Sequence, residues 1–359
     1  MKKVNLLWLF LALFLLFLGG LTWLITGFHR DYRNIPREHL IGNKASIVAT
    51  LKEGRFPFSF LVIVDPTGGE AAESLIETSI EDGKPSFMVI LGDFVKKPDI
   101  WKHRFFLTEM TMEIKPPFPV FLVPGNHDID YFRSKGRSDE RRVTPEVYES
   151  LYGARNLDFV FNESLFIICG VDLKRPADFI YFLRDVLSKK SAGKKHIFVF
   201  VHYPSKGLAK HIPGSMPITK EEEFFALLET FKVTTCFFGD YHGYWRGQRK
   251  GVNLIVSGGG GRLKQSQPKW GKFHHIIKVT VGRNGVSEDL IVLKKDIGLM
   301  HWEDSFEEIV FSELFPIVEH RGWILYGSFF FFSLLSFLSF VLPLLFGFWQ
   351  TRKGSQSGR

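Results

Sequence analysis

The sequence contains few cysteines for its length. Only two of its 359 residues are cysteines, Cys169 and Cys236, and each lies within an apolar run of strand-like pattern. This number excludes a small fold held together by several disulfides. The two residues could form a single buried disulfide or remain inert thiols, and we expect thiols.

Charged residues are absent from two long stretches, one near each end of the chain. Residues 4–28 contain none, and a helix of that length crosses about 30 Å of hydrocarbon. A second apolar run covers residues 323–349 and has Trp323 and Trp349 at its ends, where interfacial anchors are common. The sequence therefore predicts a transmembrane helix at 4–28 and another at 323–349.

The first apolar run has a basic start, Lys2 and Lys3, so a cleaved signal peptide is an alternative. Its apolar core is too long for a signal peptide and no small-residue cleavage site follows, which favours an uncleaved anchor. Two spans place both tails on one side, and the basic residues near both ends, including the basic tail 350–359, favour the cytoplasm. The central domain would then lie outside the cytosol, although three arginines between residues 30 and 37 oppose this orientation.

The formal net charge is +8, with basic residues dispersed along the chain. Small clusters such as Arg141–Arg142 and Lys189–Lys195 are compatible with a phosphate-rich partner or an anionic lipid surface. Each cluster alone is explained more simply by a solvated face. No strip of aromatic and basic residues marks a nucleic-acid groove, so we expect no nucleic-acid partner and disfavour a nuclease.

Between the two apolar ends, strand-length apolar runs alternate with helical patterns. Such runs lie at residues 58–64, 87–91, 121–124, 166–171, 196–201 and 234–238. This alternation predicts an α/β fold whose functional residues follow the carboxyl ends of strands. We assign the remaining segments as follows: a membrane-proximal linker at 29–55, the α/β domain at 56–300 and an amphipathic juxtamembrane segment at 301–322.

Polar side chains of metal-ligand type follow five of these runs. They are Asp65, Asp93, Asn126 with His127, His202, and Asp240 with His242. Any one of them alone is most simply a turn former or a surface residue. Five successive strand ends with such residues are harder to obtain by accident, and carboxylate, amide and imidazole groups together suit divalent cations.

The loops that carry these residues resemble those of the calcineurin-like metallophosphoesterases. That family has the pattern Asp-x-His, Gly-Asp, Gly-Asn-His-Asp/Glu, a His after a strand, and Gly-His-x-His. The corresponding stretches here are Asp65-Pro66-Thr67, Gly92-Asp93, Gly125-Asn126-His127-Asp128, His202-Tyr203-Pro204 and Gly239-Asp240-Tyr241-His242. The resemblance covers roughly residues 55–282 and implies a four-layer sandwich of two mixed β-sheets flanked by helices.

The resemblance also implies two divalent metal ions, of manganese, iron, zinc or magnesium, that share one carboxylate. The implied ligands are Asp93 as the bridge, Asp65 and His242 on one ion, and Asn126, His202 and Asp240 on the other. By the same resemblance, His127 contacts the scissile phosphate and assists the leaving group, and Asp128 completes the catalytic motif. Two such cations activate a water and clamp the phosphate oxygens during in-line displacement.

Two positions depart from the family pattern. Thr67 stands where the family has the His of Asp-x-His, and Asp240 stands where it has the first His of Gly-His-x-His. Asp240 remains a competent ligand and shifts the preference toward hard ions such as Mn²⁺ or Mg²⁺. Thr67 is a poor replacement, so we expect the ion beside it to bind less tightly. A smaller departure is Lys96, where many relatives carry an acid.

These patterns together predict a membrane-anchored, metal-dependent phosphoric ester hydrolase. A phosphoesterase takes a phosphorylated substrate, and the location near a membrane suggests a lipid-linked one. The alternative is a catalytically impaired binding or assembly module that keeps the fold, and the missing imidazole at Thr67 is its best support.

Overall fold

The computed structural model describes residues 2–36, 38–52, 54–67, 69–81, 84–133, 139–205, 218–261, 263, 272–294, 300–319, 321, 323, 326–335 and 337–338. The chain forms two compact units. The larger is Ile35–Glu308, and the smaller combines the two chain ends, Met1–Asn34 and Ile309–Arg359.

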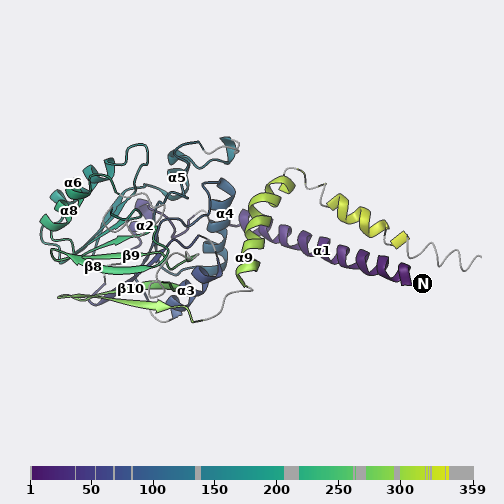
Figure 1. The fold of residues 1–359 in the computed structure, drawn as a ribbon, viewed down its shortest axis with the longest axis horizontal. Coiled ribbons are helices and arrows are strands. Elements are labelled where there is room, and N and C mark those ends of the chain that lie inside the picture. The colour runs from purple at the N-terminus through teal and green to yellow at the C-terminus, as the bar shows by residue number, and fades with distance from the viewer. Residues whose placement is uncertain are drawn as a thin grey trace, which may run out of the picture. The chain divides into compact units, whose positions relative to one another are not determined.

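The larger unit contains two mixed β-sheets, which Figure 1 shows as stacked ribbons. The strands are β1 (Phe58–Val64), β2 (Met88–Leu91), β3 (Val120–Val123), β4 (Leu157–Phe161), β5 (Ser164–Cys169), β6 (His196–Val201), β7 (Thr235–Phe238), β8 (Tyr244–Arg249), β9 (Val252–Ser257), β10 (His275–Val281) and β11 (Val286–Val292). The first sheet has the order β11-β10-β1-β2-β3 and the second β4-β5-β6-β7-β9-β8. The central strands β1, β2 and β3 are parallel, as are β5, β6, β7 and β9, so their carboxyl ends lie at one edge of each sheet.

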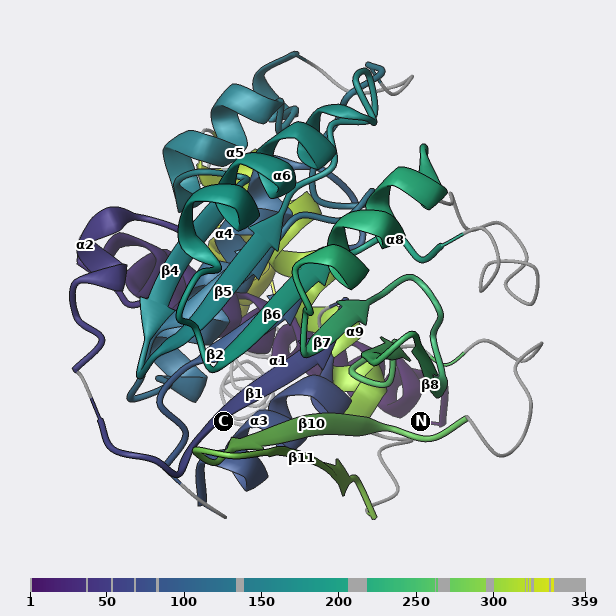
Figure 2. The same ribbon diagram turned by 90° about the vertical axis from the view of Figure 1, so that its left-hand side faces the viewer.

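Helices lie around the two sheets. They are α2 (Ala45–Val48), α3 (Glu70–Glu81), α4 (Ile100–Thr108) with the π-helix η1 (Glu109–Ile114), the 3₁₀ turn η2 (Asp139–Arg141), α5 (Pro145–Tyr152), α6 (Asp178–Lys190), α8 (Glu221–Thr230) and α9 (Met300–Ile309). Apolar residues of α3, α4 and α5 share a core with the first sheet, and those of α6 and α8 share one with the second. Figure 2 shows α6 and α8 lying over the strands of the second sheet. The predicted sandwich of two mixed sheets flanked by helices is confirmed.

Phenylalanines fill the layer between the two sheets. Phe60 stacks on Phe87 with ring centroids 5.1 Å apart and meets Phe166 edge-on at 5.3 Å. Phe200 and Phe237 stack at 5.1 Å in the same core. Offset and edge-to-face aromatic pairs stabilise a core beyond the area that they bury, by about 0.5–1.5 kcal/mol each. The chain is rich in phenylalanine, with 38 among its 359 residues. Part of these phenylalanines therefore belong to the domain core and not to the apolar ends of the chain.

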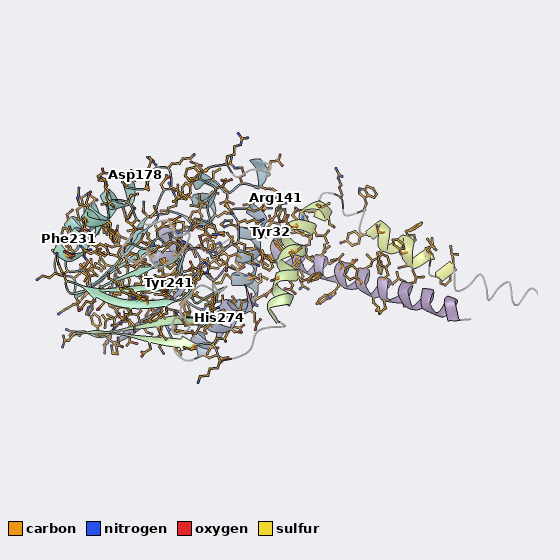
Figure 3. All side chains as sticks on the ribbon, in the orientation of Figure 1. Tyr32, Arg141, Asp178, Phe231, Tyr241 and His274 are labelled. Atoms are coloured by element: carbon orange, nitrogen blue, oxygen red, sulfur yellow. The ribbon has the colours of Figure 1, made fainter. Side chains whose placement is uncertain are left out.

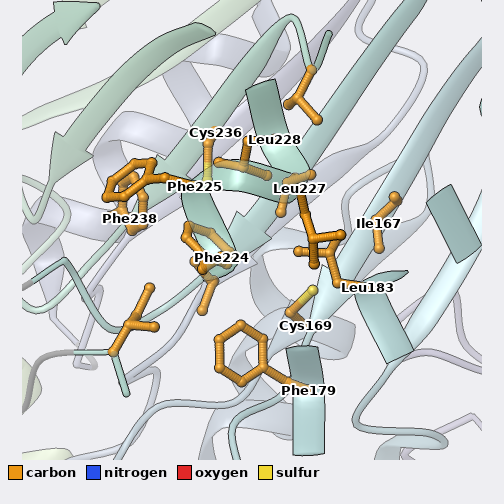
Figure 4. Close-up of a cluster of buried hydrophobic side chains, with 14 of the residues drawn as sticks. Ile167, Cys169, Phe179, Leu183, Phe224, Phe225, Leu227, Leu228, Cys236 and Phe238 are labelled. Carbon is orange, nitrogen blue, oxygen red and sulfur yellow. The ribbon is translucent and has the colours of Figure 1, made fainter. Parts of the chain in front are cut away.

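The two cysteines lie in the core between the second sheet and its helices, and both are free thiols (Figure 4). Cys169 on β5 pairs with Val201 of β6, and Cys236 on β7 pairs with Val199 of the same strand. Strands β5 and β7 are separated by β6, which places them about 9.5 Å apart. A disulfide requires Cα atoms within about 7 Å, so the two residues cannot be bridged, as the sequence analysis expects.

Residues before β1 extend the edge of the first sheet. Ile41 forms a parallel bridge with Val120 of β3, and Asn43 bridges to Gly153. The buried Asn43 side chain donates to the Leu122 carbonyl at 2.6 Å and accepts from the Leu122 N–H at 3.0 Å. Residues from Ile35 onward therefore belong to the compact unit, although the sequence analysis assigned 29–55 to a linker.

The smaller unit contains α1 (Lys2–Arg33), which is longer than the predicted span of 4–28. Its segment Leu11–Arg33 has 23 residues and a mean hydropathy of 2.1, enough to cross a membrane by length and composition. This is weak evidence, since signal sequences and buried core helices share both properties. Within the predicted second span, the described residues include the apolar helix Tyr326–Leu335, whereas 339–349 and the tail 350–359 lie outside the described residues.

Candidate active site

The site forms where loops leave the carboxyl ends of β1, β2, β3, β6 and β7. Four side chains predicted as ligands sit on backbone with positive φ: Asp65 at 51°, Asp93 at 50°, Asp240 at 60° and His242 at 51°. This left-handed region is uncommon for residues other than glycine and costs of order 1 kcal/mol or more per residue. Such strain is typical of functional sites, where the surrounding structure holds the chain in place.

Three predicted ligands from three different strands converge. One ligand atom each of Asp65, Asp93 and His202 lies within 4.8 Å of the others. The His202 ring has Nε2 at 3.5 Å from Asp93 Oδ1 and Nδ1 at 3.6 Å from Asp65 Oδ1. All three side chains are buried, so the cluster lies inside the protein and is not a solvated acidic patch.

The His202 ring is oriented by the backbone. Its Nδ1 lies 3.1 Å from the Leu91 carbonyl, which can only accept a hydrogen bond, so the ring proton sits on Nδ1. The lone pair of Nε2 is then available on the Asp93 side. Both His202 Nε2 and Asp65 Oδ2 are buried without a hydrogen-bond partner. Unpartnered buried atoms of this kind fit a bound cation, with the Leu91 carbonyl acting as the supporting group that fixes a ligating histidine.

The charges of the cluster are strongly coupled. Burial raises the pKa of Asp65 well above its usual value, and the nearby Asp93 and Asp240 carboxylates add to this effect. Burial acts in the same direction on Asp93, but the His202 and His127 imidazoles outweigh it and lower the pKa of Asp93 to about 2. The pKa of His202 is raised well above its usual value because the carboxylates outweigh its burial. The protein has gathered more negative than positive charge here, which a divalent cation would balance.

Asp128 joins two loops of the site. It is fully buried, and its two carboxylate oxygens accept four backbone N–H groups, from Gly125 at 2.7 Å, Asp93 at 2.8 Å, Phe94 at 3.1 Å and Val95 at 3.3 Å. Burial, with a contribution from the Asp93 charge, raises the pKa of Asp128 to about 7. The carboxylate therefore fixes the loop after β2 against the loop after β3.

His127, the neighbour of Asp128, faces outward. Its side chain is 48% exposed, and its backbone N–H donates to Asp93 Oδ1 at 3.0 Å. Its ring Nδ1 lies 2.7 Å from the Lys96 carbonyl, and Nε2 lies 4.0 Å from Asp93 Oδ2. The ring thus combines solvent access with a fixed direction beside the buried carboxylate.

The other predicted ligands lie around this cluster. The Asp240 N–H donates to Asp65 Oδ1 at 3.3 Å, which ties the loop after β7 to the loop after β1. Within the described part of the chain, the side chains of Asp240 and His242 are not members of the group that meets within 4.8 Å. Figure 3 draws the side chains of this region and labels Tyr241, which lies between Asp240 and His242 in the sequence.

Thr67 is held by its own loop and its neighbour. Its N–H donates to the Asp93 carbonyl at 2.9 Å, and its hydroxyl lies 3.5 Å from the Asp65 carbonyl, long for a hydrogen bond. The Thr67 backbone thus connects the first two loops, and its hydroxyl is turned toward main chain.

Two glycines leave room for the ligands, and the sequence analysis assigned no role to either. A Cβ at Gly125 would lie 2.2 Å from Asp93 Oδ1. A Cβ at Gly258 would lie 2.2 Å from the His242 nitrogen and 2.6 Å from Asp65 Oδ2. Gly258 shows that the His242 backbone and the Asp65 carboxylate approach the same point. The glycine run at 258–261, which follows β9 and precedes β10, was the signal that could have identified this position.

The chain belongs to the calcineurin-like phosphoesterase family, whose model matches residues 65–244. This confirms the family identification made from the loop motifs. Comparison with curated proteins finds no match.

Solved structures share the fold at low sequence identity. A purple acid phosphatase from yellow lupin seeds is 14% identical with a TM-score of 0.51, over 67% of this chain and 52% of that one. This chain thus spans about half the length of the lupin enzyme. GAP50 of Plasmodium, described as an anchor in the inner membrane complex, is 13% identical with a TM-score of 0.46, over 67% of this chain and 85% of that one. A dimetal phosphatase from Danio rerio is 12% identical with a TM-score of 0.46, over 64% of this chain and 98% of that one.

Proposed function

We propose that this protein is a metal-dependent phosphoric ester hydrolase. The observation that carries the proposal is the buried meeting of Asp65, Asp93 and His202, with His202 Nε2 and Asp65 Oδ2 lacking any partner in the protein. The proposal assigns six ligands to two divalent metal ions: Asp65, Asp93, Asn126, His202, Asp240 and His242. Asp93 would be the carboxylate shared by both ions, which agrees with its place between the two imidazoles of His127 and His202.

When bound, such ions lower the pKa of a water and neutralise the charge that develops on phosphate oxygens. The side chains then have separate tasks. His127 is the group that reaches solvent, so it contacts the phosphate ester and delivers a proton to the leaving oxygen from Nε2. Asp128 is a positioning residue in this proposal, since both of its oxygens are engaged by backbone N–H groups. Asp128 fixes the positions of Asp93 and His127 relative to each other.

The departures from the family pattern make the two ions unequal. Asp240 supplies oxygen where the family has imidazole, which favours manganese or magnesium over zinc, with iron as the remaining choice. The Thr67 hydroxyl is turned toward the Asp65 carbonyl, so it adds no ligand of comparable strength. We expect the ion beside Asp65 and His242 to dissociate first.

A second candidate function is a binding or assembly module that has lost catalysis. The orientation of Thr67 favours it, because one metal position lacks an imidazole. Metal content separates the two candidates. About two ions per chain support the hydrolase, and a chain that binds none supports the module.

The proposal includes membrane attachment. The helix Leu11–Arg33 supports one span, and the apolar run 323–349 supports a second. With both tails in the cytoplasm, the catalytic domain would be extracytoplasmic, and a lipid-linked phosphate would be within reach. Reporter fusions at the carboxyl tail test this orientation: a tail that reports an extracytoplasmic position overturns it.

The hydrolase is tested with the full chain purified in detergent. The assay measures release of p-nitrophenol from p-nitrophenyl phosphate and bis-p-nitrophenyl phosphate with Mn²⁺. Wild-type protein should turn over at least one substrate, whereas Asp93→Ala should fall by about a thousandfold or more, since it removes the bridge. Equal background rates for both proteins on both substrates would overturn the proposal.

A further inference from the structure

Lys96 and Glu308 form an ion pair that connects the last helix of the larger unit to the active-site loop. Lys96 Nζ pairs with Glu308 Oε2, and Lys102 Nζ on α4 pairs with Glu308 Oε1 at 3.0 Å. The Glu308 and Lys102 side chains are each 9% exposed. The buried Glu308 carboxylate and the buried Lys102 ammonium hold each other in one place, because leaving either of them unpaired there would be costly, and Lys96, whose side chain is 40% exposed, pairs with the same carboxylate.

Lys96 belongs to the loop that begins with the bridging carboxylate. The first part of this loop is fixed by Asp128, which accepts the N–H groups of Asp93, Phe94 and Val95. These three hydrogen bonds of Asp128 end at Val95, one residue before Lys96. The side chain of Lys96 instead leads to Glu308, so the two carboxylates hold the two ends of the same short loop.

The backbone of Lys96 contacts the proposed proton donor. Its carbonyl lies 2.7 Å from His127 Nδ1, and a carbonyl can only accept, so this contact keeps one ring proton on Nδ1 and leaves Nε2 as the nitrogen that takes up and delivers the second proton. Nε2 then points to the Asp93 side, at 4.0 Å from Oδ2. Because the His127 side chain is 48% exposed, the Lys96 carbonyl is a main restraint on the direction of its ring.

We propose that Glu308 is a positioning residue for His127 and acts through Lys96. The proposal rests on the proposed phosphoesterase function. Glu308 pairs with the Lys96 side chain and so fixes the position of residue 96. The Lys96 carbonyl then orients the His127 imidazole toward the leaving group. This role also accounts for Lys96, at a position where the family resemblance leads one to expect an acid. The acid of the ion pair is Glu308 of α9, and the loop supplies the cation, Lys96.

The kinetic test uses the full chain in detergent with Mn²⁺ and an aryl phosphate. Glu308→Gln should lower kcat roughly 10- to 100-fold, as loss of a supporting contact commonly does, with KM changed less than about twofold. Lys96→Met, which leaves Glu308 paired with Lys102, should give the same loss. Added to His127→Ala, Glu308→Gln should cause no further loss, because residues that act through one group are not additive.

The matched control is Glu288→Gln. Glu288 is a buried carboxylate on β11 with a 5% exposed side chain, paired with Arg246 at 2.8 Å. It also approaches Thr235, the first residue of β7, at the opposite end of that strand from the site loop. Glu288→Gln should leave kcat and KM within about twofold of wild type.

A second readout does not depend on hydrolysis. The ring ¹⁵N shifts of His127 in labelled full-length protein report which nitrogen carries the proton. At alkaline pH, where the ring carries a single proton, wild type should show the Nδ1–H form, and Glu308→Gln and Lys96→Met should show a mixture of both tautomers. A protein without any hydrolysis but with this pattern would overturn the proposed function and leave the positioning of His127 intact.

Three results would overturn the positioning role. The first is an unchanged tautomer and kcat in both Glu308→Gln and Lys96→Met. The second is a full loss caused by Glu308→Gln in the His127→Ala background. The third is a rise in KM without loss of kcat in Lys96→Met, which would mean that the ammonium group contacts substrate directly.

Discussion

The two sides of the active site are built differently. The β2–β3 side, residues 92–96 and 125–128, is closed by the protein itself, because the carboxylate of Asp128 receives four backbone N–H groups. The β1–β7 side, residues 65–67 and 240–242, is not closed in this way. There one oxygen of Asp65 accepts a single long hydrogen bond from Asp240 and the other has no partner.

This difference separates positioning from ligand binding. A carboxylate whose oxygens are occupied stabilises the fold and is poorly available to a cation. A buried carboxylate with an empty oxygen weakens the metal-free fold and gains from a cation. The first side should therefore stay ordered without metal, and the second should depend on it.

The largest expected effect comes from Asp128→Ala. The substitution leaves four buried N–H groups without an acceptor, each worth about 1–3 kcal/mol, so the free energy of unfolding should fall by about 4 kcal/mol or more. Urea unfolding of the full chain, followed by tryptophan fluorescence, measures it. A loss below about 1 kcal/mol would mean that Asp128 does not hold the loops together.

Removal of metal should come next. At a concentration one hundred times the dissociation constant, a bound ion stabilises the folded state by about 2.7 kcal/mol, and a chelator removes this gain. Thermal melts with Mn²⁺ and with EDTA should differ for wild type, and the difference should shrink in Asp65→Asn. Equal melting temperatures in the wild-type protein with and without Mn²⁺ would argue against a metal site.

Acid should weaken the β2–β3 side through His103. This fully buried ring contacts the Asp128 carbonyl and the Tyr152 hydroxyl, each at 3.0 Å, and burial lowers the pKa of His103 to about 3. The pKa of His103 in the folded chain lies below the unfolded value of about 6.5. Between these two values, His103 binds a proton in the unfolded chain but not in the folded chain. The contribution of His103 to stability should therefore fall as the pH drops from 6.5 toward 3, by about 2 kcal/mol at pH 5.

Unfolding measured at pH 7.5 and pH 5 in wild type and in His103→Gln checks this prediction. The variant should be less stable at neutral pH but should lose less stability on acidification. An equal loss in both proteins would assign the acid sensitivity to other groups.

The smallest expected effect on folding is that of Asp65→Asn without metal. Burial raises the pKa of Asp65, so its charged form opposes folding, and the amide should change the stability of metal-free protein by less than about 1 kcal/mol or increase it slightly. Elemental analysis should nevertheless show less bound Mn²⁺. A large destabilisation of the metal-free protein by Asp65→Asn would remove the contrast between the two sides.

The strand pattern was read correctly because parallel central strands are buried on both faces and appear as continuous apolar runs. The predicted runs at 58–64 and 196–201 coincide with β1 and β6. The short segment around Asn43 was not recognised as part of the domain, since its role depends on hydrogen bonds to Leu122, 79 residues away. Such contacts leave no local period in the sequence.

The sequence by itself determined the sandwich, the five strand-end loops and the side chains available for metal chemistry, because burial period and loop position are local properties. Only the tertiary structure decided which carboxylate holds loops and which keeps an oxygen empty, and that Glu308 reaches Lys96 across 212 residues. The physical reason is that hydrogen-bond satisfaction and ion pairing depend on distances between segments, which the chain acquires only when the two sheets pack and the last helix returns to the site.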